Sequence, residues 1–214
     1  MSTETNKIHL YIDGQNFVRR IREVLRRRGV SEIDLTKYDL WGLLNHVFKN
    51  VDVGLASIYL ARVIPHKETV EKSEELVVRE AALKEKLESQ GFRYVVAGAV
   101  RARGRGEDVQ FEEKGVDVSI AVEILKDMYE GKVNTVILAS SDSDFQPVIH
   151  LAKEKGVRVV YLGFAARYNR GIKAAADETV LIENEVAAKF YSPYQELVQE
   201  RRGRRKRRRR GIRS

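Results

Sequence analysis

The sequence predicts an α/β fold in which helices cover both faces of a mostly parallel sheet. Short apolar runs alternate with segments of helical periodicity along most of the chain. The run at 53–63 is apolar and nearly continuous, as expected of a strand that is buried on both faces. Strands separated by helices favour parallel pairing, and 214 residues suffice for one such domain with a sizeable core.

The first half of the chain is expected to begin with a strand at 8–12. Apolar residues then recur at helical spacing from 17 to 25, and Gly29 is a plausible helix stop. Thr36 is expected to cap a second helix, whose apolar face extends to Phe48. After the strand at 53–63, a long helix is predicted at 67–90, where the chain has no Gly or Pro.

The second half starts with a predicted strand at 92–97, followed by a segment of different character at 98–114. This segment holds three glycines and three arginines and is expected to be a mobile hairpin or loop. Helices and strands then alternate again. The predicted elements are helix 116–129, strand 133–139, helix 145–155, strand 157–162, helix 170–176 and strand 179–182.

Charge is distributed unevenly along the chain. The net charge is +8, but residues 201–214 contain ten Lys or Arg and no acid, which leaves 29 of the 39 basic residues against all 31 acidic ones before them. A block of like charge is usually disordered and suits a polyanion, because phosphate contacts release condensed counterions. The alternative is a solubilising or targeting tail.

Composition excludes several classes of function. The chain has no cysteine, so disulfides, thiolate zinc sites and a cysteine nucleophile are ruled out. No apolar stretch approaches the roughly 20 residues that a membrane helix needs, and the N-terminus lacks the pattern of a signal peptide. We therefore expect a cytoplasmic protein with no membrane partner. Walker-type, dinucleotide-binding and nucleophile-elbow motifs are missing as well.

Four aspartates stand where a parallel sheet would gather them. Asp13 ends the first strand, Asp142 and Asp144 follow the strand at 133–139, and Asp117 opens a helix. Ligands bind at the carboxyl ends of such strands, and clustered carboxylates suit Mg²⁺ or Mn²⁺. Each aspartate could instead be a turn residue or a helix cap, and taken singly that interpretation is the more common one.

Polar and basic neighbours could support such a site. Asn16, Ser140, Ser141 and Ser143 can cap helices or bind a phosphate or metal-bound water, and Lys114 could offset negative charge or be an exposed loop residue. Three arginines beside flexible glycines could hold a nucleic-acid backbone, or simply face solvent. They are Arg101, Arg103 and Arg105.

Four segments in order carry a resemblance to a known family. They are YIDGQN at 11–16, KGVDV at 114–118, SSDSDF at 140–145 and GVRVV at 156–160. Together they resemble the NYN domain, in particular its LabA-like branch among the PIN-like nucleases. The resemblance implies a three-layer α/β/α sandwich, with a nuclease domain at 7–183. A C-terminal extension at 184–200 and a disordered basic tail at 201–214 would follow it.

The same resemblance implies a metal-dependent endoribonuclease. Asp13, Asp117, Asp142 and Asp144 would hold Mg²⁺ or Mn²⁺, and the products would carry 5′-phosphate and 3′-hydroxyl ends. Ser141 and Ser143 stand where the family often has Gly. Glu123 stands where it often has a further Asp, but a residue six positions after Asp117 does not share its helix face. RNA is the expected partner, and the oligomeric state stays open, with a homodimer among the alternatives.

Two other functions remain open from the residues. One is a catalytically silent RNA-binding or adaptor protein that keeps the fold. The other is a phosphohydrolase with Asp13 as nucleophile, although Gln15 stands where such enzymes carry a second Asp.

Overall fold

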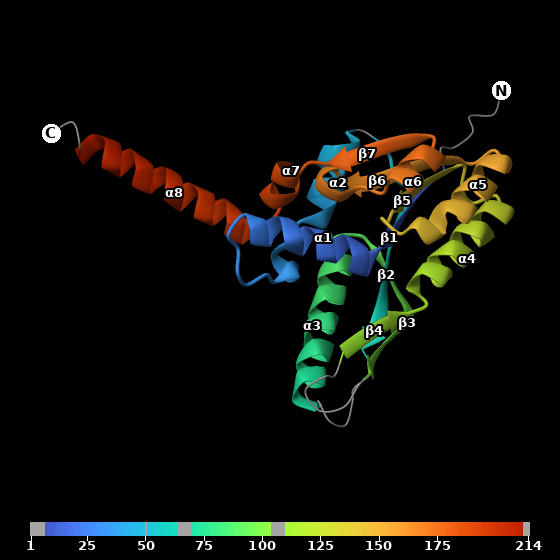
Figure 1. Ribbon diagram of the computed structural model, residues 1–214, viewed down its shortest axis with the longest axis horizontal. Helices are drawn as coiled ribbons and strands as arrows, with labels where there is room; N and C mark the ends of the chain where they lie inside the picture. The colour runs from blue at the N-terminus through green and yellow to red at the C-terminus, as the bar shows by residue number, and fades with distance from the viewer. Residues whose placement is uncertain (1–6, 50, 64–69, 104–109, 212–214) are drawn as a thin grey trace.

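The computed structural model describes residues 7–49, 51–63, 70–103 and 110–211. Seven strands form one sheet in the order β4-β3-β2-β1-β5-β6-β7 (Figure 1). The strands are β1 Ile8–Asp13, β2 Leu55–Val63, β3 Arg93–Arg103, β4 Gln110–Lys114, β5 Thr135–Ala139, β6 Arg158–Phe164 and β7 Glu178–Ile182. Only β4 is antiparallel to its neighbour, so the other six strands form an all-parallel sheet.

Helices cover both faces of this sheet, which confirms the predicted three-layer α/β/α architecture (Figure 1). One face carries α1 Gly14–Arg27, α2 Leu40–Phe48, α3 Val70–Ser89 and α7 Asn184–Lys189. The other carries α4 Val116–Tyr129, α5 Gln146–Glu154 and α6 Arg170–Ala175. Short 3₁₀ helices lie between these elements: η1 Leu35–Lys37, η4 Ser143–Phe145 and η5 Ala165–Arg167.

The central strand shows why the sheet needs both layers. Leu10 and Ile12 of β1 pack into the cluster under α1 and α2, whereas Tyr11 packs into the cluster under α4. All three side chains are almost fully buried. Alternation along a strand places successive side chains on opposite faces, so a strand that is apolar throughout requires cover on both sides.

The segment at 98–114, expected to be a mobile hairpin or loop, contributes to an antiparallel pair of strands. β3 continues to Arg103, and β4 pairs with it from Gln110, while 104–109 lie outside the described residues. Gly98 has φ +74, and a Cβ at this position would lie 2.1 Å from the carbonyl oxygen of Lys114. The glycine therefore lets the two antiparallel strands approach closely.

The cap of α2 also differs from the prediction. Asp39, rather than Thr36, accepts a hydrogen bond of 2.8 Å from the backbone N–H of Gly42. Thr36 lies inside η1 and is itself bound by the Asp34 side chain. Asp34 thus caps η1, and Asp39, which immediately precedes α2, caps α2.

The C-terminal segment belongs partly to the folded body. Ala187 and Ala188 of α7 and the following Tyr191 are buried, and Tyr191 accepts a hydrogen bond of 3.0 Å from the backbone N–H of Asp34. The last helix, α8 Ser192–Gly211, then projects away from the domain (Figure 1). The described part of this helix ends at Gly211, and the disorder expected from residue 201 stays a prediction. Within the described ranges no helix is both long and apolar enough to cross a membrane.

Candidate metal centre at the carboxyl edge of the sheet

Asp13 and Ser140 lie side by side at the carboxyl edge of the sheet. β1 and β5 are adjacent and parallel, with Ile12 opposite Ala139. The next residue of each strand, Asp13 and Ser140, therefore stands at the same level of the sheet. The Ser140 hydroxyl donates a hydrogen bond of 2.9 Å to Oδ2 of Asp13. The other carboxylate oxygen, Oδ1, accepts a bond of 3.0 Å from the backbone N–H of Asn16 and thereby caps α1.

Asp142 reaches the same hydroxyl through its backbone. Its N–H donates a bond of 3.2 Å to Ser140 Oγ, and its Oδ1 accepts one of 3.0 Å from the N–H of Asp144. Asp142 is half-buried and caps η4, while Asp144 is exposed. Ser140, which is itself buried, therefore links the two predicted segments around Asp13 and Asp142.

The charges around Asp13 and Asp142 favour the binding of a cation. Burial raises the pKa of the Asp13 carboxyl, and the charge of Asp142 raises it further. The hydrogen bonds from Asn16 and Ser140 and the charge of Arg19 act in the opposite direction and are outweighed. A buried carboxylate beside a second one is destabilised unless a positive charge is near, and a divalent ion would supply it.

Asp117 lies in the first turn of α4, two residues after Gly115, whose φ is +94. It is half-buried, and its helix contacts both β1 and η4. Asp117 thus belongs to a helix that packs against both of the other segments. Yet across the described part of the chain, no three His, Asp or Glu side chains come together closely enough to form a metal site.

The donor set nevertheless fits a hard cation. Mg²⁺ is usually held by one or two carboxylates, together with waters and substrate phosphates, rather than by a full protein cage. Asp13 and Asp142 would supply such a pair. Asp117 and Asp144 are further carboxylates on the adjoining α4 and η4.

The remaining predicted residues fall into three groups. Asn16 and Ser141 are half-buried beside the pair, whereas Ser143 and Lys114 are exposed. Arg101 and Arg103 belong to the backbone of β3, but their side chains lie outside the described part. Arg105 lies outside the described residues altogether.

Asn169 was missed by the sequence reasoning. Its Nδ2 donates a hydrogen bond of 3.0 Å to the carbonyl of Ser141, and its Oδ1 caps α6 by accepting one of 3.0 Å from Ile172. The residue thereby ties the loop after β5 to the helix that follows β6. Its position just before the predicted helix at 170–176 was the available signal, since Asn is a preferred cap.

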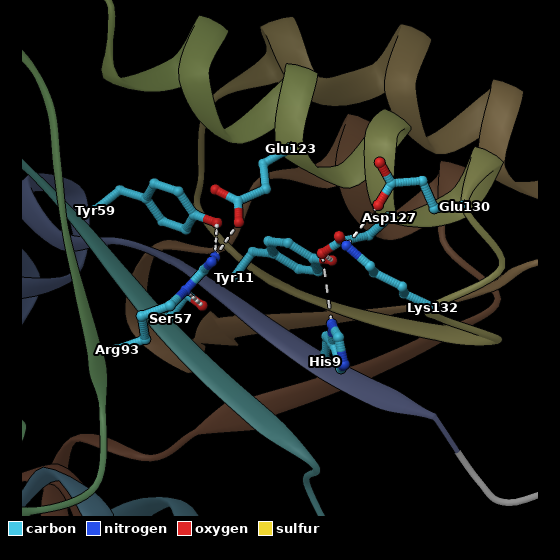
Figure 2. Close-up of polar contacts among 9 residues, drawn as sticks. All are labelled: His9, Tyr11, Ser57, Tyr59, Arg93, Glu123, Asp127, Glu130 and Lys132. Carbon is cyan, nitrogen blue, oxygen red and sulfur yellow. Dashed lines mark hydrogen bonds and ion pairs between the residues drawn. The ribbon is translucent and has the colours of Figure 1, made fainter.

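Glu123 is half-buried between α4 and the sheet (Figure 2). It forms an ion pair with Arg93 of β3. Arg93 also donates hydrogen bonds to Ser57 Oγ at 2.9 Å and to the Tyr59 hydroxyl at 3.2 Å. These contacts fasten the helix to β2 and β3, so Glu123 has a structural partner.

A second polar group lies beside it under the same helix (Figure 2). The Tyr11 hydroxyl donates a hydrogen bond of 2.7 Å to Oδ2 of the buried Asp127, and His9 Nδ1 lies 3.5 Å from the same oxygen. Burial and the Asp127 carboxylate both raise the pKa of Tyr11, which keeps its hydroxyl protonated as a donor. This group also fastens α4 to the sheet.

Comparisons with known proteins agree with this architecture. The solved structure of VPA0982 from Vibrio parahaemolyticus, described as a protein of unknown function, matches with a TM-score of 0.51 and 20% identity over 85% of this chain and 96% of that one. At that identity the match shows the fold alone. The uncharacterized protein MJ0482 of Methanocaldococcus jannaschii is 27% identical over 81 residues, which are 38% of this chain and about a third (34%) of that protein.

The family comparison covers most of the chain. The model of the NYN domain matches residues 7–183, from the start of β1 to just past β7. This range contains both segments joined by Ser140 as well as the first turn of α4. The chain therefore belongs to the NYN domain family, a PIN-like family grouped with nucleases.

Proposed function

We propose that this protein is a metal-dependent endoribonuclease that hydrolyses RNA phosphodiester bonds. The observation that carries the proposal is the pairing of buried Asp13 with Asp142 through Ser140, at the sheet edge of a chain in this family. Asp13 and Asp142 would hold Mg²⁺ or Mn²⁺, with Asp117 and Asp144 as the additional carboxylates of the site.

Each residue of the site would have its own role in an in-line displacement at phosphorus. When bound, the ion would lower the pKa of a water and stabilise charge on the phosphoryl oxygens. The Asn16 N–H and the Ser140 hydroxyl hold the Asp13 carboxylate in one orientation. Asp117 would accept the proton of the attacking water. The water oxygen bonds to phosphorus as the P–O3′ bond breaks, and the leaving oxygen takes up a proton, so a 5′-phosphate and a 3′-hydroxyl result.

The decisive experiment incubates labelled RNA with the purified full chain in Mn²⁺ or Mg²⁺. We expect cleavage that EDTA stops and that Asp142→Asn reduces at least about 100-fold, a loss typical of removing one charged catalytic group. Asp52→Asn is the matched control, because it removes one exposed carboxylate before β2. Cleavage by Asp142→Asn at the rate of the parent would refute the assignment.

One observation favours a second candidate. Since no three acidic or histidine side chains of the described residues gather as a metal site, the chain could keep the fold as a silent RNA-binding or adaptor protein. Such a protein would bind RNA with a steep salt dependence and cleave none. The incubation above separates the two, because only the nuclease yields metal-dependent products.

A further inference from the structure

We propose that the solvent face of α1 is a track for the backbone of single-stranded RNA, leading from the candidate metal centre toward α8. The choice of RNA rests on the proposed function, whereas the existence of the track does not depend on cleavage. Nothing in the family match or in the predicted site assigns a role to this helix face.

The helix starts at the metal centre. Asp13 is the N-cap of α1, and the 14 residues of the helix extend about 21 Å from it at 1.5 Å per residue. The buried side of α1 is apolar, with Phe17, Ile21, Val24 and Leu25. At 100° per residue, five arginines occupy an arc of about 160° on the other side. They are Arg19, Arg20, Arg22, Arg26 and Arg27. Four of them are exposed, whereas the Arg20 side chain is only 15% exposed.

Positive charge on this face exceeds what its single acid can neutralise. Glu23 is the one acidic residue of α1, and Arg20 Nη1 lies 3.0 Å from its Oε2. Burial acts to raise the pKa of Glu23, but the hydrogen bond from Arg20 and the charges of Arg20, Arg167 and Arg19 outweigh it and lower the pKa. Several guanidinium groups therefore share one carboxylate.

Arg22 on this face is repelled by neighbouring cations. Burial lowers the pKa of Arg22, and the neighbouring charges of Arg26 and of Arg79 on α3 lower it further. A row of cations held in this way is stabilised by an external polyanion, and phosphate groups fit the guanidinium fork.

A small groove continues the charge along the sheet edge. Arg20, Arg27 and the Arg20-paired Glu23 of α1 line it, together with Phe164 at the end of β6 and Arg167 of η5. Because β6 is parallel to β5 and β5 to β1, this groove and Asp13 lie at the same edge. Positive charge from the middle of α1 therefore reaches the edge of the sheet at which Asp13 lies.

The far end of α1 meets α8. Arg28 Nη1 lies 3.5 Å from the Tyr194 hydroxyl, and Arg201 Nη2 lies 3.4 Å from the place where a Cβ would stand on Gly29. From there α8 leads away from the domain (Figure 1), and residues 201–211 of it contain nine Lys or Arg. The exposed arginines of α1 thus connect the sheet edge with the most basic part of the chain.

The composition of the track indicates what it recognises. The sole aromatic residue of α1 is Phe17, which is buried, so no ring on this helix is available to stack a base. Arginine contacts to phosphates position a nucleic acid without reading its sequence. We therefore expect binding that depends on salt and hardly on sequence.

The test measures binding of a labelled single-stranded RNA by anisotropy over a salt series, in EDTA so that no cleavage occurs. The variant Arg19→Gln/Arg22→Gln/Arg26→Gln removes three charges along one stripe and spares Arg20. Three lost phosphate contacts lower the slope of log K against log salt by about 2 for a single strand. Gln resembles Arg in helix propensity, so α1 is retained.

A second triple variant is the matched control. Lys126→Gln/Lys155→Gln/Lys173→Gln removes the same charge from exposed positions on or next to α4, α5 and α6, on the opposite layer. Its slope should equal that of the parent. Should the first triple variant misfold by circular dichroism, Arg19→Gln and Arg26→Gln are measured singly, each with an expected decrease of about 0.7.

The outcomes distinguish the track from the proposed function. An unchanged slope in the α1 variants, or no RNA binding by the parent, overturns the track. A decreased slope in a protein that cleaves no RNA with Mn²⁺ supports the track and refutes the nuclease. Metal-dependent cleavage with an unchanged slope supports the nuclease and refutes the track.

Discussion

The Ser140 hydroxyl donates a hydrogen bond of 2.9 Å to Oδ2 of Asp13, across two strands that are 127 positions apart in the chain. Ser140→Ala would leave that buried oxygen without its donor, at a cost of about 1–3 kcal/mol in unfolding free energy. We also expect cleavage to need more Mn²⁺, because Asp13 loses its fixed orientation. Denaturant unfolding and a metal titration of activity measure the two effects. Ser31→Ala, at an exposed position outside the predicted site, should change neither.

The buried charge of Asp13 should lower the stability of the metal-free protein although it is needed to bind the ion. Its carboxylate is 9% exposed and lies near Asp142, so Asp13→Asn removes an unfavourable buried charge. We expect the metal-free variant to melt at or above the temperature of the parent. Mn²⁺ should raise the melting temperature of the parent but not that of the variant. At a hundredfold excess over Kd, the added unfolding free energy of the parent would be about 2.7 kcal/mol. An equal Mn²⁺ effect in both proteins would place the ion elsewhere.

The ion pair between Glu123 and Arg93 predicts a structural role for Glu123. Glu123→Gln keeps the size of the side chain but removes its charge, so stability should fall by about 1 kcal/mol. Cleavage at saturating RNA should stay within about twofold of the parent, since the side chain contacts Arg93 rather than the Asp13 corner. A loss as large as that expected of Asp142→Asn would show that Glu123 takes part in catalysis.

Adding one methyl group at Gly98 should reduce the unfolding free energy strongly. A Cβ there would lie 2.1 Å from the Lys114 carbonyl oxygen at a φ of +74, so Gly98→Ala should cost about 2–4 kcal/mol. Gly91→Ala is the control, because Gly91 has φ +91 but no atom within 4 Å of the added Cβ. It should cost only the backbone strain, about 1 kcal/mol. Equal losses in urea unfolding would show that the contact with Lys114 is not important.

Asp177 predicts a pH dependence of stability. Its Oδ2 accepts a bond of 2.8 Å from the Val159 N–H, which lowers the pKa of the carboxyl against the opposing effect of burial, and Lys153 lowers it further. A pKa that is lower in the folded state contributes stability above the unfolded value of about 3.9, and this contribution disappears as pH falls through the folded pKa. Asp177→Asn should therefore cost about 1 kcal/mol at pH 7 and nothing near pH 2. Urea midpoints at several pH values measure it, and a pH-independent difference would contradict the assignment.

The order of strands and helices could be predicted from local patterns. The helix at 116–129 has the predicted bounds, because its apolar spacing is regular and a glycine stands on either side of it. The segment at 98–114 could not be predicted in the same way. Its glycines are typical of a loop, yet the close contact between Gly98 and Lys114 is decided by the pairing of β3 with β4.

The sequence by itself determined the α/β class, the parallel sheet and the placement of Asp13 and of the 140–145 segment at the ends of strands. Those properties follow from short-range periodicity, which every stretch of the chain carries within itself. Only the tertiary structure decided that Ser140 joins Asp13 to Asp142, that Glu123 faces Arg93, and that α1 presents its arginines between the sheet edge and α8. Such relations depend on strand register and helix packing, which bring together residues that no local pattern relates.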